Sequence, residues 1–254
     1  MHKKAMVAGS LGIFLLLVIS FSGCVNQEKE TDPAIQKIKD AGKLVVGTST
    51  PYEPMEYIDN GKYVGFDIDV AREIATALGV ELEIKDMDFD DLLDAVEAGT
   101  VDISIAAITI TLERSEQVLF SNAYLNAGQV IIVNETNTDI NNENDLENKI
   151  VGVQEGTTSE DEALRYTTAS LVKSYGNYTA ALEAIQSEEI DAIVIDYPAG
   201  VGLIKDTPGL EIVGDPFTNE LYGIAVKKGN SALKIEIDKV IASISIEELE
   251  NKWF

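Results

Sequence analysis

The chain carries one strand and helix layout twice, and this repetition limits the folds it can adopt. In AVEAGTVDISIA (95–106) and AIQSEEIDAIVI (184–195), a helix end is followed by a short turn, an aspartate and an apolar strand. Strands alternate with helices ahead of each copy, and such an order predicts a mostly parallel sheet with helices on both faces. No Gly/Ser-rich or Pro-rich linker separates the copies. We therefore predict an α/β fold of two lobes that face each other.

Apolar periodicity places the individual elements. Val70, Ile74 and Leu78 share one face of a predicted helix. In the second lobe, a helix is predicted to begin at a capping box formed by Ser159 and Glu162. The elements predicted for the first lobe are strands at 43–49, 80–86 and 101–111 and helices at 67–78 and 89–98.

Charged residues follow the predicted strands where α/β sheets bind ligands, beyond the carboxyl ends of the strands. Arg114, one of three arginines in a chain of net charge −25, follows the strand of the first copy. Asp196 comes directly after the strand of the second copy. The turn at 156–158 opens a helix, and the free amides of a helix N-terminus suit an anion. A cation, a carboxylate and a set of amides complement a zwitterion, and an α-amino acid is the ligand that they favour.

The inventory of reactive side chains excludes several enzyme classes. His2 is the single histidine and Cys24 the single cysteine, and both precede the globular part. Hydrolysis by a Ser-His-Asp triad, Cys-His chemistry and ordinary zinc sites are therefore excluded there. The acidic run at 86–97 imitates a calcium-binding loop, but Asp91 occupies the position that needs glycine. We expect no metal site and no cofactor.

The N-terminal residues predict export. A basic head at 2–4 is followed by an uncharged apolar run at 5–22 and by Gly23-Cys24, which is the order of a secretory signal peptide. A lone cysteine after a small residue looks like a lipoprotein processing site, so we expect a lipid on Cys24. The alternative is an uncleaved membrane anchor, because the run is long enough to span a bilayer. Either outcome holds the globular part at the cell membrane, outside the cytoplasm.

The net charge of the exported part limits the kinds of molecule that it can bind. Removal of residues 1–23 takes away two lysines and no acidic residue, which changes the formal charge from −25 to −27. Such a surface repels phosphate backbones, so nucleic acid is a poor candidate partner. A large net charge also keeps a protein soluble.

Several separated motifs, taken together and in their order, resemble the extracellular solute-binding proteins. More closely, they are similar to the polar amino-acid group that delivers substrates to ABC importers. The resemblance covers the chain from about residue 35 to its C-terminus. The motifs are GTSTPYEPMEY, GFDIDVA, DFDDLL, VDISIAAITITLER, FSNAY, VGVQEGTT, IDAIVID and YGIAVKKGN.

The resemblance implies a type II periplasmic-binding-protein-like fold, in which two lobes are joined by two crossing strands. The crossings are expected at 124–129 and 218–223, where Gly128 and Gly223 could absorb backbone rotation. An ABC permease in the membrane is the implied partner, and we expect a monomer. The implied boundaries are a signal peptide at 1–23, a lipid-anchored linker at 24–33, the first part of lobe 1 at 34–128, lobe 2 at 129–220 and the C-terminal return of lobe 1 at 221–254.

The resemblance also assigns roles in the site. Arg114 matches the arginine that holds the ligand α-carboxylate, which a planar guanidinium does with two hydrogen bonds. Asp196 matches the carboxylate that receives the α-ammonium group. The other residues implied to line the site are Thr109 and the backbone of Ala107 from lobe 1, Thr157 and Thr158 from lobe 2, and the aromatic pair Tyr52 and Phe89, which would flank the ligand side chain.

One departure bears on specificity. Ser49 stands where members that bind basic amino acids have an acidic residue, which favours a neutral or polar ligand. Glu53, close in sequence, could replace part of that charge. Gln154 could reach the far end of the ligand.

Two other functions remain open at this point. Some proteins of similar fold are dehydratases, and Glu53 or Glu155 could serve one as general acid if burial raised its pKa. A sensor whose closed form is recognised by a receptor would use the same ligand chemistry. Asn134 and Asn177 begin Asn-x-Thr glycosylation motifs.

Overall fold

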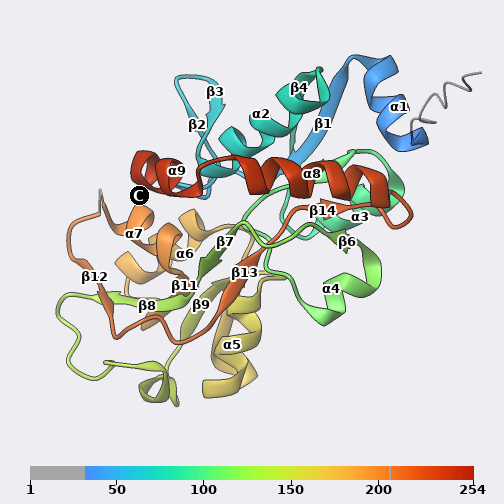
Figure 1. Ribbon diagram of the computed structural model, residues 1–254. Coiled ribbons are helices and arrows are strands. Elements are labelled where there is room, and N and C mark those ends of the chain that lie inside the picture. The colour runs from blue at the N-terminus through green and yellow to red at the C-terminus, as the bar shows by residue number, and fades with distance from the viewer. Residues whose placement is uncertain (1–31, 206) are drawn as a thin grey trace, which may run out of the picture. The chain divides into compact units, whose positions relative to one another are not determined.

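The computed structural model describes residues 32–205 and 207–254, which form two lobes, each built on a five-stranded sheet (Figure 1). The predicted signal peptide and Cys24 lie outside the described residues. Within the described part, no helix has the length and apolarity needed to cross a bilayer.

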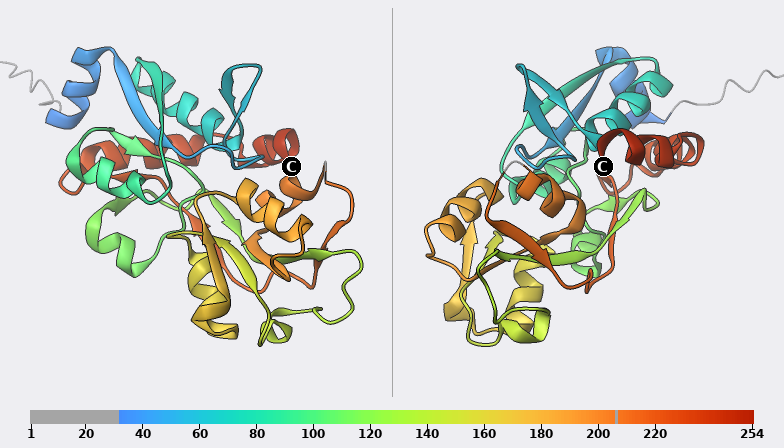
Figure 2. Two further views of the ribbon diagram at one scale, coloured as in Figure 1. Left: turned by 180° about the vertical axis from the view of Figure 1, so that it is seen from behind. Right: turned by 90° about the vertical axis from the view of Figure 1, so that its left-hand side faces the viewer.

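The first sheet has the strand order β4-β1-β5-β14-β6. Apolar side chains of α1, α2 and α8 cover one face and those of α3 the other. Figure 2 shows the ribbon from two further directions. Its strands are β1 (Lys43–Thr48), β4 (Glu81–Asp86), β5 (Ile103–Ser104), β6 (Leu119–Phe120) and β14 (Ala225–Val226), with a hairpin of β2 (Tyr57–Asp59) and β3 (Lys62–Val64). Its helices are α1 (Pro33–Ala41), α2 (Phe66–Leu78), α3 (Asp91–Ala98), α4 (Leu112–Gln117), α8 (Ser231–Ser243) and α9 (Ile246–Trp253).

The second sheet has the order β10-β9-β11-β8-β12. Apolar side chains of α6 and α7 pack on one face, and Ala163 of α5 packs on the other. Its strands are β8 (Gln129–Asn134), β9 (Val151–Gln154), β10 (Val172–Tyr175), β11 (Ala192–Asp196) and β12 (Leu210–Val213). Its helices are α5 (Thr158–Tyr166), α6 (Tyr178–Gln186) and α7 (Tyr197–Lys205), with short 3₁₀ turns η1 (Glu143–Leu146) and η2 (Ala169–Leu171).

The helix predicted at 67–78 forms as α2, and its buried face carries Val70, Ile74 and Leu78. Gly79 ends it in the left-handed region at φ 73°, where glycine has no steric penalty. The helix predicted at 89–98 forms as α3, in which Leu92 and Val96 are buried.

The first sheet is less regular than predicted. The strand predicted at 101–111 forms a sheet ladder only at β5, because Ala107 has a φ of 48° and breaks the pleat. Beyond it, Thr109 makes an isolated antiparallel bridge to Tyr222. Both sheets are mixed, since β14 and β8 run antiparallel to their neighbours. The expectation of mostly parallel sheets holds only for the β4-β1-β5 and β10-β9-β11 parts.

The predicted capping box at Ser159 is wrong. Helix α5 begins at Thr158 with Thr157 as its N-cap, and Ser159 is buried inside the first turn. The turn is held instead by Glu160, whose carboxylate accepts a hydrogen bond from Gly156 N at 2.9 Å. Glu162 forms an ion pair with Arg165 on the same helix.

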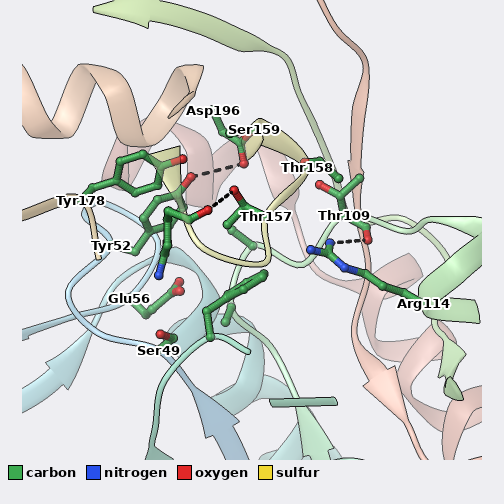
Figure 3. A pocket seen from close by; sticks show the side chains of 14 residues that line it. Ser49, Tyr52, Glu56, Thr109, Arg114, Thr157, Thr158, Ser159, Tyr178 and Asp196 are labelled. Atoms are coloured by element: carbon green, nitrogen blue, oxygen red, sulfur yellow. Dashed lines mark hydrogen bonds between the residues drawn. The ribbon is translucent and has the colours of Figure 1, made fainter. Parts of the chain in front are cut away.

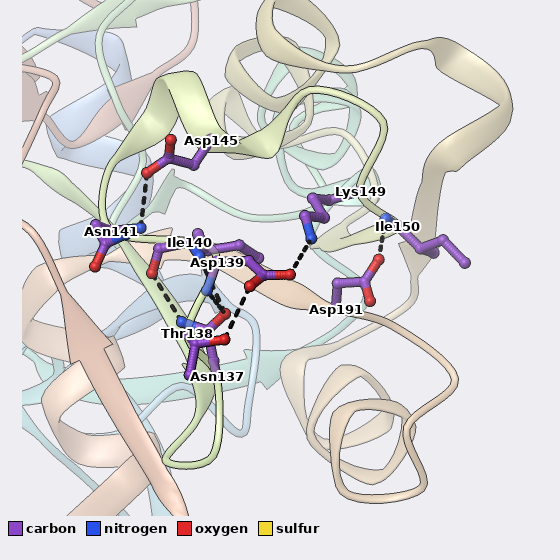
Figure 4. A network of polar contacts seen from close by, with 9 residues as sticks. All are labelled: Asn137, Thr138, Asp139, Ile140, Asn141, Asp145, Lys149, Ile150 and Asp191. Carbon is purple, nitrogen blue, oxygen red and sulfur yellow. Dashed lines mark hydrogen bonds and ion pairs between the residues drawn. The ribbon is translucent and has the colours of Figure 1, made fainter.

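The two copies of the sequence repeat share one hydrogen-bonding arrangement, in which an aspartate contacts the backbone of a neighbouring strand. Asp102 precedes β5, and its Oδ2 accepts a hydrogen bond from Val45 N in β1 at 3.0 Å. Asp191 precedes β11, and its Oδ2 accepts one from Ile150 N beside β9 at 2.7 Å (Figure 4). Each aspartate therefore ties the start of its own strand to that of the neighbouring parallel strand.

The two sheets are connected by an antiparallel pair of strands, β7 (Leu125–Ala127) and β13 (Glu220–Tyr222), inside the two segments expected to cross. The flanking glycines have a packing role. A Cβ on Gly128 would lie 2.7 Å from Pro216 Cβ, and one on Gly223 would lie 2.7 Å from side-chain carbons of Ile110. These distances are too short for any larger residue.

Candidate functional site

One pocket contains all nine residues that the resemblance assigned to ligand binding (Figure 3). It lies between the carboxyl ends of β1 and β5 on one side and those of β9 and β11 on the other. The empty space between its lining atoms, open solvent included, is about 360 Å³. The suggested residues that line it are Ser49, Tyr52, Phe89, Ala107, Thr109, Arg114, Thr157, Thr158 and Asp196. Glu56, Ala106, Gln154, Ser159 and Tyr178 also line it.

Arg114 is held with its guanidinium at one end of the pocket. Its backbone N donates to Thr111 Oγ1, the N-cap of α4. Nη1 donates to Thr109 O and Nη2 to Gly156 O, both at 2.9 Å, and the group lies 5.3 Å from the ring centroid of Phe89. Because a guanidinium has five N–H donors, these contacts leave donors for a carboxylate. Burial lowers the pKa of Arg114.

Asp196 ends β11 in a buried position. Its Oδ2 accepts hydrogen bonds from the hydroxyls of Tyr222 at 2.5 Å and Tyr52 at 3.2 Å. Its Oδ1 is also buried, and no described residue donates to it. Burial raises the pKa of Asp196 to about 7, against the hydrogen bonds of the two tyrosines. A buried oxygen without a donor is costly, so this carboxylate is suited to a ligand that brings one.

The hydroxyls of the second-lobe threonines are already engaged. Thr157 Oγ1 donates to Gln154 O at 2.8 Å. Thr158 Oγ1 donates to Glu220 Oε2 and accepts from Gln129 Nε2, both at 3.0 Å. At this end of α5, the groups suited to an anion are therefore the backbone N–H groups of the first turn.

The backbone at Ala107 is engaged as well, which differs from the role expected for it. Its N–H donates to Asp67 Oδ2 at 2.7 Å, and the Tyr124 hydroxyl donates to the same oxygen at 2.9 Å. Asp67 is fully buried in the GFDID motif, and burial raises its pKa to about 7. It holds the strained turn at Ala107 in place, so it shapes the pocket wall without lining the pocket.

Comparisons with known proteins identify the family. The model of the bacterial extracellular solute-binding proteins, family 3, matches residues 44–254. The chain belongs to this family.

Named relatives are binding proteins of transport systems. The L-cystine-binding protein TcyJ of Escherichia coli (strain K12) is 31% identical over 87% of this chain and 85% of its own length. The ABC transporter glutamine-binding protein GlnH of Bacillus subtilis (strain 168) is 30% identical over 99% of this chain and 97% of its own. A solved structure of an ancestral arginine-binding protein bound to glutamine has a TM-score of 0.80 and 42% identity, covering 84% of this chain and 98% of that one.

The predicted type II fold is thereby confirmed, and so is the role of an extracellular or periplasmic solute-binding protein. The homologues are amino-acid-binding components of ABC transporters.

Sequence reasoning missed three residues that line the pocket of this solute-binding protein. Tyr178 packs its ring against Tyr52, with centroids 5.7 Å apart, and no pattern around it gave a signal. Ser159 was taken as a helix cap. Glu56 is 1% exposed, and it lies in the motif PYEPMEY, four residues after Tyr52. Neither Glu53 nor Glu155, the candidate acids of a dehydratase, is among the lining residues.

Two glycines of the second lobe receive groups from the first. Gly156 accepts the hydrogen bond from Arg114, and a Cβ on it would lie 1.7 Å from Asp90 Oδ1. Gly202 of α7 faces the Glu53 carbonyl, which would lie 2.5 Å from an added Cβ. The lobes therefore meet closely on both sides of the pocket.

Proposed function

We propose that this solute-binding protein captures a free α-amino acid, neutral or polar, and delivers it to an ABC permease. The observation that carries the proposal is that Arg114 and the unsatisfied oxygen of Asp196 line the same pocket. A zwitterion would bring a carboxylate to the first and an ammonium group to the second. Few other metabolites carry both charges on one carbon.

Capture proceeds by closure of the lobes. Arg114 and the aromatic ring of Phe89 belong to the first lobe and bind the amino acid first. Asp196 and the start of α5 arrive from the second lobe. The hydrogen bond from Arg114 to Gly156 joins the lobes, and separation of the lobes would break it. Ligand binding therefore shifts the population toward the closed form.

The protein works as a monomer, tethered outside the cytoplasm by a lipid on Cys24. The fixed tether keeps the closed form near its permease. Mass spectrometry of the membrane-extracted protein tests this part, since a diacylglyceryl group on Cys24 is expected and an intact residue 1–23 segment would contradict it.

Calorimetry with the full-length protein in detergent tests the ligand class. The panel contains the twenty amino acids, matched carboxylic acids without the amine, matched amines without the carboxylate, and prephenate-like acids. Binding confined to amino acids is expected, with losses of about 100-fold or more for analogues that lack either charge. Binding of the amine-free acids as tightly as the amino acids would contradict the assignment of Asp196. Conversion of a prephenate-like acid would establish the dehydratase alternative.

A further inference from the structure

The carboxyl group of Glu56 is an unsatisfied polar group at the wall of the pocket. Its side chain is buried, and its Oε2 has no hydrogen-bond partner among the described residues. None of the ion pairs within 32–205 and 207–254 includes it. Burial raises its pKa, and the nearby carboxylates of Asp67 and Asp86 raise it further. The fold alone gives this residue no reason to be acidic.

Glu56 lies away from the two groups that hold the ligand head. Figure 3 places Arg114 on one side of the pocket and Glu56, beside Ser49, on the other, with Asp196 apart from both. An amino acid held at its carboxylate by Arg114 and at its ammonium group by Asp196 would extend its side chain past Tyr52 and Phe89. The end of that side chain would then meet Glu56 and Ser49.

The charges of the pocket favour a donor at this end. The carboxylate and ammonium group of a bound zwitterion match the charges of Arg114 and Asp196 and leave nothing for Glu56. A ligand side chain that ends in N–H groups would supply the missing partner. One that ends in a carboxylate would place a second acid beside Glu56. An aliphatic end would leave the buried oxygen unpaired, which is strongly selected against when a site is built around a hydrogen bond.

We infer that Glu56 is a specificity-determining residue, which selects amino acids whose side chain ends in an N–H donor, a carboxamide or a cationic nitrogen group. The inference rests on the proposed function, because it uses the ligand pose set by Arg114 and Asp196. It readmits the basic amino acids that Ser49 disfavours, since the acidic residue absent at position 49 is present in the same pocket at position 56.

Ligand pairs of nearly equal size test the inference on the unaltered protein. With the full-length protein in detergent, calorimetry compares glutamine with glutamate, and arginine and lysine with norleucine. We expect the N–H-bearing member to bind about 100-fold more tightly in each pair. Arginine against its uncharged isostere citrulline then separates a preference for cations from one for amides. Equal binding of norleucine, glutamate and the N–H-bearing ligands would overturn the inference.

The variant Glu56→Gln replaces the carboxyl group by a carboxamide with little change of volume. It is expected to reduce the glutamine-over-glutamate ratio by about 30-fold or more while alanine, too short to reach position 56, binds as before. Glu73→Gln, an exposed residue of α2, is the matched control and should leave all ratios unchanged. An unchanged ratio in a folded Glu56→Gln protein would overturn the inference, and if that variant does not fold, the ligand pairs decide.

Failure of this inference differs from failure of the proposed function. If amino acids bind without regard to the side-chain end, only the role of Glu56 is wrong. If no amino acid binds, the proposed function is wrong, and the inference is wrong with it.

Discussion

The two lobes share a scaffold but differ in what they bring to the pocket. Each has a run of three parallel strands and an aspartate that ties the start of one strand to its neighbour. At the other end of the strands the similarity stops. The first lobe presents Arg114, and the second presents Asp196 and the N-terminus of α5. The repeated part of the sequence therefore forms the shared sheet scaffold, while the residues just beyond the strands provide the charged groups of the pocket.

Arg114→Ala should have the largest effect, because it removes the cation of the first lobe and leaves the ligand carboxylate buried without a partner. We expect affinity to fall by about 100-fold or more. Arg165→Ala in the second lobe is the control, since Arg165 is exposed and pairs only with Glu162 on its own helix. Calorimetric titration of the preferred amino acid measures both. Comparable losses in the two variants would remove the functional distinction between the lobes.

The pH dependence of affinity distinguishes two buried aspartates, one in each lobe, whose pKa values are both raised to about 7. A ligand with an ammonium group needs Asp196 ionised. Below pH 7, the dissociation constant should therefore rise about tenfold for each unit by which the pH falls, and above pH 7 it should be constant. Asp196→Asn should bind weakly and lose this slope. Asp67→Asn should keep the slope, because Asp67 lies outside the pocket. A slope that survives Asp196→Asn would assign the titration elsewhere.

Protein stability should vary with pH in the opposite direction. In both aspartates the folded-state pKa of about 7 lies above the ordinary 3.8, so the folded chain binds more protons between these values. Stability of the ligand-free protein should therefore fall as the pH rises from 4 to 7 through these two groups. Urea denaturation at several pH values checks this. Each Asp→Asn variant should reduce the slope, and a slope unchanged by both would show that other groups dominate.

Gly202→Ala tests whether close approach of the lobes is needed for binding. The added methyl group would collide with the Glu53 carbonyl across the lobes, so closure should become less favourable and affinity should fall about tenfold, as for moderate overpacking. Gly176→Ala is the control in the same lobe, because no atom lies within 4 Å of its added Cβ. With ligand present, small-angle X-ray scattering should show a larger radius of gyration for Gly202→Ala and an unchanged one for Gly176→Ala. Native affinity and native radius would mean that the contact is dispensable.

The smallest effects are expected from the shared scaffold. Asp102→Asn should cost about 1–2 kcal/mol of stability and Asp191→Asn about 0.5–1, because Asp102 is the more buried and also pairs with Lys37. Ligand affinity should change less than threefold in either. Urea denaturation and calorimetry measure the two quantities. A large loss of affinity in one variant would mean that its aspartate affects ligand binding as well as the stability of the scaffold.

The sequence predicted the fold well where local patterns decide it. Helix α2 with its buried face and the glycine stop at Gly79 follow from periodicity and from glycine's freedom in the left-handed region. The family fold is confirmed by the comparisons. Arg114 and Asp196 stood out because each follows a predicted strand, and the structure brings both to one pocket.

The remaining features depend on contacts between distant segments. The strand at 101–111 is cut short because Asp67, forty residues earlier, holds the turned backbone at Ala107. The capping box at Ser159 fails because Glu160 satisfies the turn from one position further on. Tyr178 reaches the pocket only through tertiary packing, so no local spacing could indicate it. Glu56 is joined to Tyr52 by local backbone hydrogen bonds, and its spacing of four residues from Tyr52 was the available signal.

The two hydrogen bonds of Arg114 connect one residue to both lobes. Its Nη1 contacts the first lobe at Thr109, and its Nη2 contacts the second at Gly156. A ligand carboxylate bound by Arg114 would contact the same guanidinium that donates a hydrogen bond to the opposite lobe. The group that would hold the cargo is therefore also one of the groups that hold the two lobes together.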